Sequence, residues 1–232
     1  MKLPIIDTLV LIPAHNEAQH IAKVVLSALA YLPVLVVDDG SQDETATLAV
    51  QSGSVVISQK PNQGKGAALK VGFRYAIDQG YRFVLTLDGD GQHDPQEIPK
   101  FLEVKSNQEA DLVIGERDFS QMPMVRRFAN TSGRLLLSWA LGQPIRDNQS
   151  GYRLVSTRLA EVTLTSQQSG FEFEVDMVVD CVNNDLKLAW VPIKTIYAGE
   201  KSHISYLSHT KKFLSLVWLI RQERKKIEKI HR

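Results

Sequence analysis

The first half of the chain alternates short apolar runs with segments in which apolar residues recur every three or four positions. The apolar runs predict buried strands over residues 9–12, 34–37, 55–57, 83–87 and 112–114. Two periodic sets predict helices between them: Ile21, Val24, Val25, Ala28 and Leu29, then Leu69, Phe73, Ala76 and Ile77. Strands that alternate with helices are typical of an α/β fold, so we expect a mostly parallel central sheet flanked by helices.

After residue 115 the alternation becomes less regular. The pattern predicts a loop near 120–123, a helix over 127–141, a polar turn over 147–151, a helix over 172–183 and a strand over 189–192. A chain of 232 residues, 44% of them hydrophobic, can fill one substantial core. We therefore expect a single domain over residues 1–210, followed by a helix over 211–232.

Charge is spread unevenly along the chain. The formal net charge is +1, yet residues 211–232 hold eight Lys or Arg and two Glu, so the remainder carries a net negative charge. Basic charge confined to one end of a near-neutral chain argues against a nucleic-acid partner. The single cysteine, Cys181, excludes an intramolecular disulfide framework, and no apolar signal core precedes Pro4. The apolar stretch over 213–220 is too short to span a bilayer, so we expect a cytoplasmic protein.

The C-terminal residues form a basic amphipathic pattern. Phe213, Leu216, Val217 and Ile220 recur at helical spacing, with Trp218 adjacent and basic residues following. Such a helix could rest on an anionic membrane surface and hold the protein peripherally at the inner face of the membrane. It could equally pack on the core and leave a solvated basic end. The sequence leaves both hypotheses open.

Two carboxylates and an amide follow the apolar run 83–87 at alternate positions: Asp88, Asp90 and Gln92. Open α/β sheets bind their ligands at the carboxyl ends of strands, where these side chains are expected. Oxygen ligands suit Mg²⁺ or Mn²⁺, which completes its shell with water and phosphate oxygens, so Asp90 and Gln92 are candidate metal ligands. The same segment also reads as a helix start, with Asp94 as cap and Pro95 in the first turn. That interpretation leaves Asp88, Asp90 and Gln92 unexplained.

Acidic residues also follow the first two predicted strands. Glu17 ends the segment Pro13-Ala14-His15-Asn16-Glu17, and Asp38-Asp39 precedes Gly40-Ser41. Acids at a strand end can accept hydrogen bonds from a nucleotide base or ribose, which suits Glu17 and one of the two aspartates. The alternative is structural, with a helix start at Asn16 or Glu17 and a turn at Asp39-Gly40.

A glycine-bearing segment, Asn62-Gln63-Gly64-Lys65-Gly66, precedes a predicted helix. Glycines allow close approach of a phosphate, and Lys65 adds positive charge beside a helix N-terminus. The segment lacks the spacing of a P-loop, and Leu69 stands where the dinucleotide fingerprint needs its third glycine, so ATP hydrolysis and NAD chemistry are disfavoured. The alternative is that these glycines only let the helix pack closely.

The order of these motifs resembles that of family 2 glycosyltransferases. The matching segments are Pro-Ala-His-Asn-Glu, Val-Asp-Asp-Gly-Ser, Asn-x-Gly-x-Gly and Asp-Gly-Asp-Gly-Gln-His-Asp-Pro, and the similarity runs over residues 9–204. Within the family, the pattern is most similar to dolichyl- or polyprenyl-phosphate sugar synthases. The resemblance implies a GT-A fold, with a nucleotide-binding half over 1–117 and an acceptor half over 118–210. It also implies a nucleotide-sugar donor, a divalent metal and inversion at the anomeric carbon.

The resemblance also suggests a role for individual residues. Together with the strand-end and loop residues above, the donor-side candidates are Pro13, Ala14, His15, Glu17, Val37, Asp38, Asp39, Lys65, Asp88, Gly89, Asp90, Arg117 and Lys201. The acceptor-side candidates are Arg127 and Ser132, with Arg126 nearby, and Asp147, Ser150 and Gly151 of a motif similar to Asp-x-x-Ser-Gly-Phe-Arg. Asp90 and Arg117 are candidate catalytic residues, since a metal and an arginine would stabilise the departing diphosphate.

Glu172 departs from the pattern of mannosyl-phosphate synthases, which often have a lysine at this position. A phosphate acceptor needs no general base, whereas a hydroxyl acceptor would benefit from a carboxylate such as Glu172 or Asp176. Glu172 is therefore the third catalytic candidate, unless both acids simply lie on the exposed side of their helix. The expected function is sugar transfer from a UDP- or GDP-sugar to a polyprenyl phosphate, with a glycan or glycolipid hydroxyl as the alternative acceptor. A sugar nucleotidyltransferase and a non-catalytic binding module are the competing classes.

Overall fold

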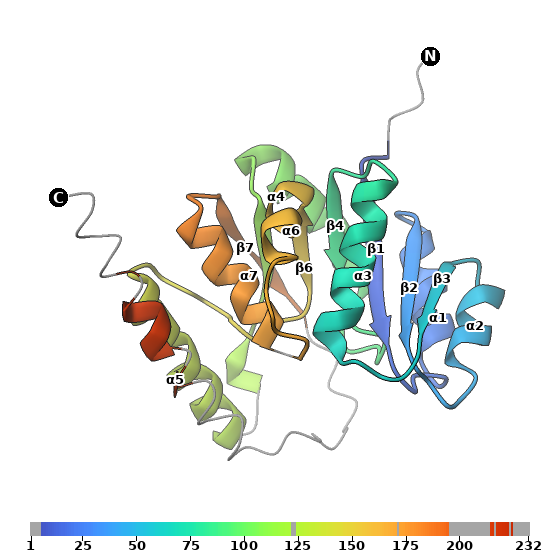
Figure 1. Cartoon of the computed structure of the whole chain (residues 1–232), viewed down its shortest axis with the longest axis horizontal. Coiled ribbons are helices and arrows are strands. Elements are labelled where there is room, and N and C mark those ends of the chain that lie inside the picture. Colours follow the sequence, from blue (N-terminus) through green and yellow to red (C-terminus); the bar gives the residue numbers. More distant parts are fainter. Residues whose placement is uncertain are drawn as a thin grey trace.

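The computed structural model describes residues 6–121, 124–170, 172–194, 214–215, 217–222 and 224 (Figure 1). Seven strands form one sheet in the order β3-β2-β1-β4-β6-β5-β7. They are β1 (Thr8–Ala14), β2 (Val34–Asp39), β3 (Val55–Gln59), β4 (Phe83–Thr86), β5 (Leu112–Arg117), β6 (Arg153–Ser156) and β7 (Leu188–Ile193). In this part of the chain, no helix is long and apolar enough to cross a membrane.

The sheet is mostly parallel, as predicted. β1 pairs in parallel with β2 and β4, β2 with β3, and β5 with β7. β6 runs antiparallel to both of its neighbours, β4 and β5. The sequence did not predict this strand, because its four residues follow a polar turn directly and are too few to show a period of two. β6 brings the turn 147–151 to the middle of the sheet.

Helices cover both faces of the sheet (Figure 1). They are α1 (Ile21–Leu29), α2 (Thr45–Gln51), α3 (Lys65–Asp78), α4 (Ile98–Gln108), α5 (Met124–Leu141), α6 (Thr157–Thr163) and α7 (Glu172–Asn183), with short 3-10 turns η1 (Pro95–Glu97) and η2 (Phe119–Gln121). The helices predicted over 127–141 and 172–183 are confirmed. α2 was not predicted, because only Thr45 and Ala49 of its seven residues are buried and no apolar period marks it.

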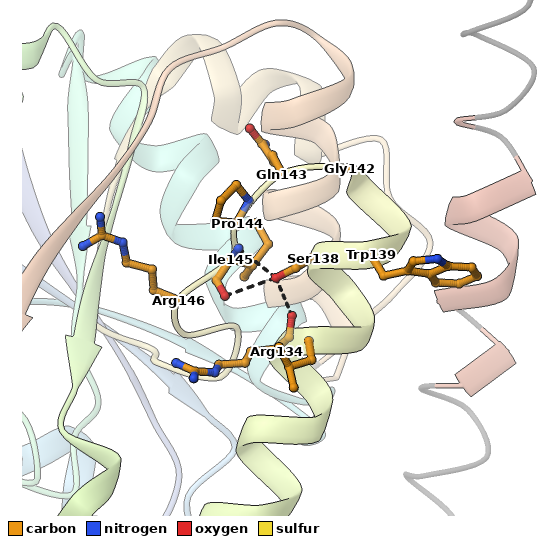
Figure 2. Close-up of a pocket in the computed structure, with 9 residues that line it drawn as sticks. Arg134, Ser138, Trp139, Gly142, Gln143, Pro144, Ile145 and Arg146 are labelled. Atoms are coloured by element: carbon orange, nitrogen blue, oxygen red, sulfur yellow. Dashed lines mark hydrogen bonds between the residues drawn. The ribbon is translucent and has the colours of Figure 1, made fainter.

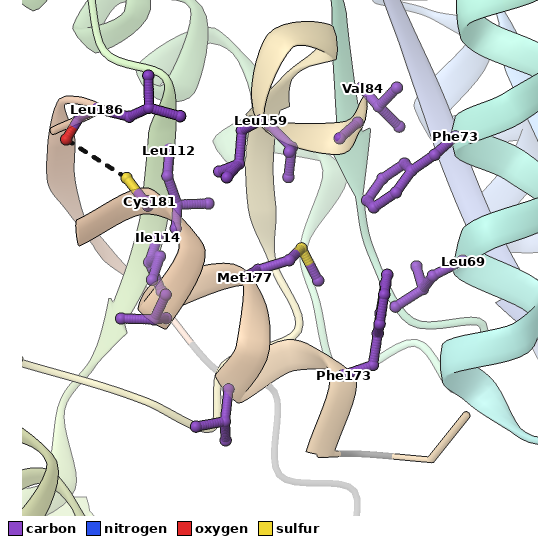
Figure 3. Close-up of a cluster of buried hydrophobic side chains, with 14 of the residues drawn as sticks. Leu69, Phe73, Val84, Leu112, Ile114, Leu159, Phe173, Met177, Cys181 and Leu186 are labelled. Carbon is purple, nitrogen blue, oxygen red and sulfur yellow. Dashed lines mark hydrogen bonds between the residues drawn. The ribbon is translucent and has the colours of Figure 1, made fainter. Parts of the chain in front are cut away.

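Alternate residues of the strands enter two separate cores. Leu9 and Leu11 of β1 join the cluster under α3, α6 and α7, whereas Val10 and Ile12 join the cluster under α1 and α4. This follows from the two-residue period of a strand that is covered on both sides. In the first cluster, Phe73 of α3 packs against Phe173 of α7 with ring centroids 6.1 Å apart (Figure 3).

The prediction that residues 55–57 form a buried strand is wrong with respect to burial. β3 is present, but Val55 is 48% exposed and both Val56 and Ile57 are only half-buried. The reason is its place at the edge of the sheet, where β2 is its only neighbour. An apolar run of this length reads the same in a central strand and in an edge strand.

The described C-terminal residues are helical, and one side of them packs on the core. Val217 and Ile220 are buried in the same cluster as α3 and α7, whereas Leu214, Trp218 and Leu219 are exposed. The guanidinium of Arg221 lies 5.6 Å from the centre of the Trp139 ring of α5. The core-packing hypothesis therefore holds for Val217 and Ile220, while Phe213 and Leu216 lie outside the described residues. Membrane contact of residues 211–232 stays a prediction.

Candidate active site

The carboxyl ends of β1, β2 and β4 bring three acidic segments to one edge of the sheet. Ala14 pairs with Asp38 in the register of β1 and β2, and the amide of Leu87 donates to the carbonyl of Leu11. Gly89 lies against the loop that follows β1, because a Cβ atom there would be 3.4 Å from Cγ of Glu17. The convergence expected from the sequence is therefore present.

Asp38 and Asp39 are buried and organise the loops around them. The Asp39 carboxylate accepts hydrogen bonds from the amides of Gln63 and Gly64, both at 2.8 Å, and from the Gln59 side chain at 2.6 Å. Asp38 accepts from the amide of Ser41 at 3.2 Å. The structural interpretation of Asp39-Gly40 as a turn holds, with Gly40 at φ +73°. A donor-binding role for either aspartate stays a prediction.

The segment after β1 is a loop and not a helix start. α1 begins at Ile21, so the alternative that placed the start at Asn16 or Glu17 is wrong. Asn16 adopts a φ of 57°, a left-handed conformation that asparagine tolerates better than most residues. Nδ1 of His15 lies 2.9 Å from the carbonyl oxygen of Asp39, and the amide of Glu17 donates to the Thr45 hydroxyl at 2.7 Å. These contacts tie the loop after β1 to the loop after β2.

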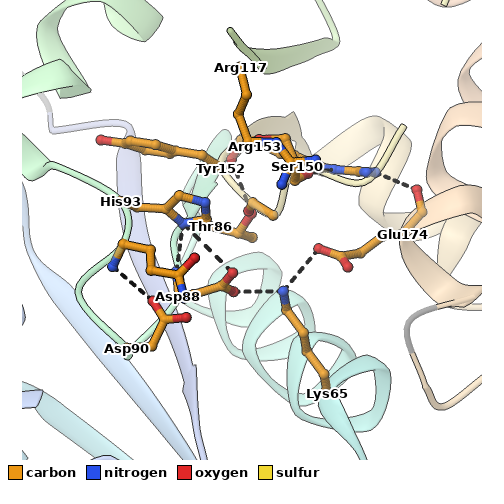
Figure 4. Close-up of polar contacts among 12 residues, drawn as sticks. Lys65, Thr86, Asp88, Asp90, His93, Arg117, Ser150, Tyr152, Arg153 and Glu174 are labelled. Carbon is orange, nitrogen blue, oxygen red and sulfur yellow. Dashed lines mark hydrogen bonds and ion pairs between the residues drawn. The ribbon is translucent and has the colours of Figure 1, made fainter. Parts of the chain in front are cut away.

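Lys65 lies between two carboxylates at the centre of the site (Figure 4). Its ammonium donates to Oδ1 of Asp88 at 2.6 Å and to Oε1 of Glu174 at 3.1 Å. Lys65 is the first residue of α3, Asp88 follows β4 and Glu174 is on α7, so the contact joins three elements distant in sequence. The positive charge expected to face phosphate is thus balanced by two acids.

In this cluster, Lys65 and the two acids each favour the charged form of the other. Burial by itself disfavours the Lys65 cation, but Asp88 and Glu174 outweigh it and raise the pKa of Lys65 above its usual value. Burial would likewise raise the pKa of Asp88, but the Lys65 cation dominates and lowers it to about 2. Asp88 keeps 29% of its side-chain surface exposed, against 7% for Glu174. Asp88 is therefore the most exposed member of the cluster, since Lys65 keeps 17%.

The glycines beside Lys65 permit a close approach of α3 to the segment before α7. A Cβ atom at Gly64 would lie 2.7 Å from the carbonyl oxygen of Ser169, and one at Gly66 would lie 2.7 Å from that of Gly170. The amide of Ala67 donates to the Ser169 carbonyl at 3.1 Å. The packing alternative for these glycines is confirmed, and phosphate binding by Lys65 stays a prediction.

The turn after Asp147 places Gly151 against the same cluster. The Thr86 hydroxyl of β4 donates to the carbonyl of Gly151 at 2.7 Å. A Cβ atom on Gly151 would lie 2.7 Å from Nζ of Lys65 and 2.9 Å from Oδ2 of Asp88. Gly151, an acceptor-side candidate, therefore lies next to Lys65 and Asp88, which are donor-side candidates.

Gly151→Ala is expected to lower the catalytic rate about tenfold or more, because the new methyl group would displace the Asp88 and Lys65 side chains by a large part of an ångström. Steady-state kinetics checks this, with a thermal melt to confirm that the variant folds. An unchanged rate would show that the Lys65–Asp88 ion pair can shift without any loss of catalysis.

Arg117 and Asp147 form a second ion pair at the end of β5. The guanidinium donates to both carboxylate oxygens, at 2.7 Å from Nε and 3.0 Å from Nη2. Arg117 keeps 17% of its side-chain surface exposed, whereas Asp147 is buried. The bidentate geometry fixes the plane of the guanidinium. A donor-side candidate and an acceptor-side candidate are again brought together.

Arg153 is a fully buried cation behind this turn. Its guanidinium donates to the backbone carbonyls of Ser150 at 2.7 Å, Asn148 at 3.2 Å and Glu174. Burial lowers its pKa, although Glu174 and Asp147 oppose this effect. Arg153 therefore holds the turn 147–151 in place relative to α7.

Asp90 and Gln92 lie in the loop after β4, and both side chains are half-buried. The amide of Gln92 donates to Oδ1 of Asp90 at 2.9 Å. Within the described ranges, no three His, Cys, Asp or Glu side chains form a group that could hold a metal ion. Mg²⁺ and Mn²⁺ are commonly held by one or two protein oxygens, with phosphate and water as the other ligands. Asp90 and Gln92 fit that donor set and do not fit a closed protein site.

His93 packs beside the site. Its Nδ1 atom accepts a hydrogen bond from the Asp88 amide at 3.0 Å, and its ring lies 5.1 Å from that of Tyr152. Burial lowers the pKa of His93 in spite of the nearby Asp88 carboxylate, so the neutral ring is favoured. Asp94 caps the turn η1, accepting from the amide of Gln96 at 3.0 Å, which confirms that prediction.

The remaining candidates lie outside this cluster or outside the described residues. Arg127 is exposed and Ser132 half-buried on α5. Glu172 is the first residue of α7, and its catalytic role stays a prediction. Lys201 and the side chain of Arg126 lie outside the described residues.

Sequence reasoning missed Glu174, the α7 acid that contacts Lys65. The signal was present, because Glu174 shares its side of the helix with Val178 and Cys181, at i+4 and i+7. The sequence alone does not single it out, because Glu172, Glu174 and Asp176 lie within about one helical turn. Asp176 is half-buried and accepts a hydrogen bond from the Ser166 hydroxyl at 2.5 Å, so it does not lie simply exposed on its helix, and its role as a base stays a prediction.

Asp180→Asn is expected to stabilise the protein by about 1 kcal/mol at pH 7. Burial and the neighbouring Asp176 carboxylate raise the pKa of Asp180 from 3.8 to about 6. The folded chain therefore binds the proton more tightly than the unfolded chain, and stability falls as the pH rises from 3.8 through 6. Urea denaturation from pH 4 to pH 8 checks this. Asp180→Asn should flatten that pH dependence, and an unchanged slope would contradict the assignment.

Comparison with known proteins places this geometry in a family. The profile of Glycosyl transferase family 2 matches residues 9–164. The chain is 29% identical over 213 residues to the UDP-N-acetylglucosamine--dolichyl-phosphate N-acetylglucosaminyltransferase of Methanococcus voltae, covering 81% of this chain and 84% of that protein. It is 32% identical over 206 residues to the polyprenol monophosphomannose synthase of Mycolicibacterium smegmatis, covering 80% and 76%.

The fold is also found among solved structures. The glucosyl-3-phosphoglycerate synthase from Mycobacterium tuberculosis, in complex with Mn²⁺, UDP and phosphoglyceric acid, superposes with a TM-score of 0.72 at 21% identity. The match covers 92% of this chain and 78% of that chain. The GT-A fold expected from the sequence is thereby confirmed.

Proposed function

Because the chain belongs to glycosyl transferase family 2, we propose that it transfers a sugar from a nucleotide sugar to a polyprenyl phosphate, with a divalent metal and inversion at the anomeric carbon. The observation that carries this proposal is the contact of Gly151, on the acceptor side, with Asp88 and Lys65, on the donor side. A transferase needs donor and acceptor groups within reach of one another. The named activities of the relatives from M. voltae and M. smegmatis support a polyprenyl-phosphate acceptor.

The reaction is a direct displacement at the sugar C1 atom. An oxygen of the acceptor phosphate forms the new bond to C1 while the bond from C1 to the nucleoside diphosphate breaks. A bound Mg²⁺ or Mn²⁺ at Asp90 and Gln92 would neutralise charge on the departing diphosphate. Arg117, oriented by Asp147, adds a fixed positive charge at the same edge of the sheet. No proton moves, since a phosphate oxygen is already an anion.

The turn before β6 offers polar groups to an acceptor. Asn148 and Ser150 are buried, and in the described structure neither the Asn148 amide nor the Ser150 hydroxyl has a hydrogen-bond partner. Unpaired buried polar groups are uncommon, and ligand binding is one reason for them. Ser150 keeps its proposed acceptor-side role on this ground. Asp147 and Gly151 of the same turn, and Arg127 and Ser132 on α5, are proposed with it from the resemblance.

The first test is a survey of donors and acceptors. Purified protein is incubated with Mn²⁺ or Mg²⁺, a panel of UDP-, GDP- and dTDP-sugars, and polyprenyl phosphate, and nucleoside diphosphate release and lipid mass are measured. We expect release that depends on the lipid and a sugar-phosphate-lipid product. Donor binding without lipid-dependent turnover would direct the search to hydroxyl acceptors, with Glu172 as the proposed base. Release of pyrophosphate from a nucleoside triphosphate would instead indicate a nucleotidyltransferase.

A further inference from the structure

Residues 88–93, which we call the Asp90 loop, leave the sheet after β4 and carry both proposed metal ligands. The paired residues of β4 end at Thr86, on the β1 side as on the β6 side. One further backbone bond, from the amide of Leu87 to the carbonyl of Leu11, extends the contact with β1. From Asp88 onward, contacts outside the sheet ladders must hold the loop in place.

The imidazole of His93 makes one of these contacts and closes the Asp90 loop on itself (Figure 4). The backbone amide of Asp88 donates to Nδ1 of His93 at 3.0 Å, so the first and last residues of the loop are joined. A backbone amide can only donate, so Nδ1 is the unprotonated nitrogen and the ring proton is on Nε2. The His93 ring is buried, which limits the competition of water for this bond.

The buried neighbours of His93 fix the orientation of its ring. The ring lies 5.1 Å from that of Tyr152, which in turn stacks on Phe101 of α4 with ring centroids 4.4 Å apart. The Tyr152 hydroxyl also donates to the carbonyl of Asp94, the residue that follows the loop, at 3.2 Å. Close packing holds buried side chains in single rotamers, so Nδ1 is aimed at the Asp88 amide before any ligand binds.

We propose that His93 is a positioning residue that holds Asp90 and Gln92 in place for the metal through its bond to the Asp88 amide. The two proposed ligands lie inside the closed loop, where the amide of Gln92 donates to Oδ1 of Asp90 at 2.9 Å. A closed loop has less conformational freedom to lose when its oxygens bind a cation. The inference rests on the metal site of the proposed function, and it adds that metal affinity depends on a residue that is not itself a ligand.

The hollow beside α5 does not compete with the Asp90 loop for a cation (Figure 2). It is lined by Arg134 and Arg146, which carry positive charge, and no acidic residue lines it. Positive side chains repel a cation at short range. We therefore expect Mn²⁺ to bind at the Asp90 loop and not in this hollow, so that Mn²⁺ affinity reports on the loop.

The test compares two substitutions in which packing and hydrogen bonding change in opposite ways. His93→Leu keeps most of the buried volume but removes the acceptor. His93→Asn leaves a smaller side chain, but its Oδ1 atom takes the place of Nδ1 as an acceptor. If packing alone mattered, His93→Asn would be the more damaging substitution. If the bond to the Asp88 amide matters, His93→Leu is the more damaging one for metal binding.

Mn²⁺ binding by the full chain is measured by electron paramagnetic resonance with UDP or GDP present. We expect the affinity to fall about 10–100-fold in His93→Leu and less than about threefold in His93→Asn. Turnover of His93→Leu should largely recover at saturating Mn²⁺, because both ligands remain, whereas that of Asp90→Ala should not. Equal affinities in wild type and both variants, or a larger loss in His93→Asn, would overturn the proposal.

Nuclear magnetic resonance tests the hydrogen bond itself in the wild-type protein without metal. The ring nitrogens of His93 should show the proton on Nε2, and the Asp88 amide should exchange slowly with solvent. Exchange should be at least about tenfold faster in His93→Leu and close to the wild-type rate in His93→Asn. A proton on Nδ1, or rapid exchange of the Asp88 amide in the wild type, would overturn the proposal whether or not the variants fold.

The same measurements separate this inference from the proposed function. If the wild type binds no Mn²⁺ with either nucleotide, the metal site of the proposed function is refuted, and the inference with it. If the wild type binds Mn²⁺ and His93→Leu binds it equally well, only the inference is refuted. A thermal melt of each variant confirms that it is folded at the temperature of the binding experiment.

Discussion

Asp90→Ala is expected to abolish metal-dependent sugar transfer, with a loss of at least about a thousandfold in turnover, and to leave the fold intact. Asp90 is half-buried in the loop after β4, where its carboxylate accepts a hydrogen bond from the amide of Gln92. The loss arises because the metal would no longer be held against the diphosphate. Turnover at saturating Mn²⁺ and metal binding by calorimetry measure it. An active Asp90→Ala enzyme would refute the metal site.

Two matched variants separate the effect of removing the Asp90 charge from the effect of disturbing the loop that carries it. Asp90→Asn keeps an oxygen that can accept from the Gln92 amide but removes the charge, so it should be nearly as inactive as Asp90→Ala. Asp94→Ala removes a cap four residues away, which should cost about 1 kcal/mol of stability and leave turnover unchanged. Equal effects of Asp90→Asn and Asp94→Ala on turnover would show that loop geometry, and not metal binding, is responsible.

Lys65→Met is expected to destabilise the protein by about 3 kcal/mol and to reduce transfer strongly. The substitution leaves the buried Glu174 carboxylate, 7% exposed, without the cation that lies 3.1 Å away. It also removes the charge that holds the pKa of Asp88 at about 2. Because that value lies below the 3.8 of the unfolded chain, the ion pair stabilises the wild type above pH 3.8, and its contribution is lost as the pH falls toward 2. Denaturant unfolding at pH 7 and pH 3 measures both effects.

The double variant Lys65→Met with Glu174→Gln separates ion pairing from simple loss of packing. Removing both charges leaves no unpaired acid at Glu174, so the double variant should be less destabilised than the sum of the two single variants by about 1–3 kcal/mol. Additive losses would mean that Lys65 and Glu174 act independently, contrary to their contact in Figure 4. Asp88 still lacks its Lys65 partner in the double variant, so transfer should stay impaired.

Local sequence patterns were sufficient for much of the fold. The buried strands β1, β2, β4 and β5 are continuous apolar runs, and α3, α5 and α7 carry helical periods, so each element could be placed before its neighbours were known. β6 and α2 were not predicted because they are short and owe their structure to the elements around them. The exposure of β3 depends on its place at the edge of the sheet, which its own residues do not encode.

In the candidate site too, the sequence determined some features and the tertiary structure decided others. The chemistry at the strand ends, with Asp88, Asp90 and Gln92 after β4, was determined by the sequence alone, because residue type and spacing decide which ligands a segment can offer. The partners of those residues were decided only by the tertiary structure, which balances Lys65 between Asp88 and Glu174 and pairs Arg117 with Asp147. The physical reason is that an ion pair depends on distances across the fold. Lys65 and Glu174 are more than a hundred positions apart in the sequence, and only the packing of α3 against α7 brings their charges within 3.1 Å.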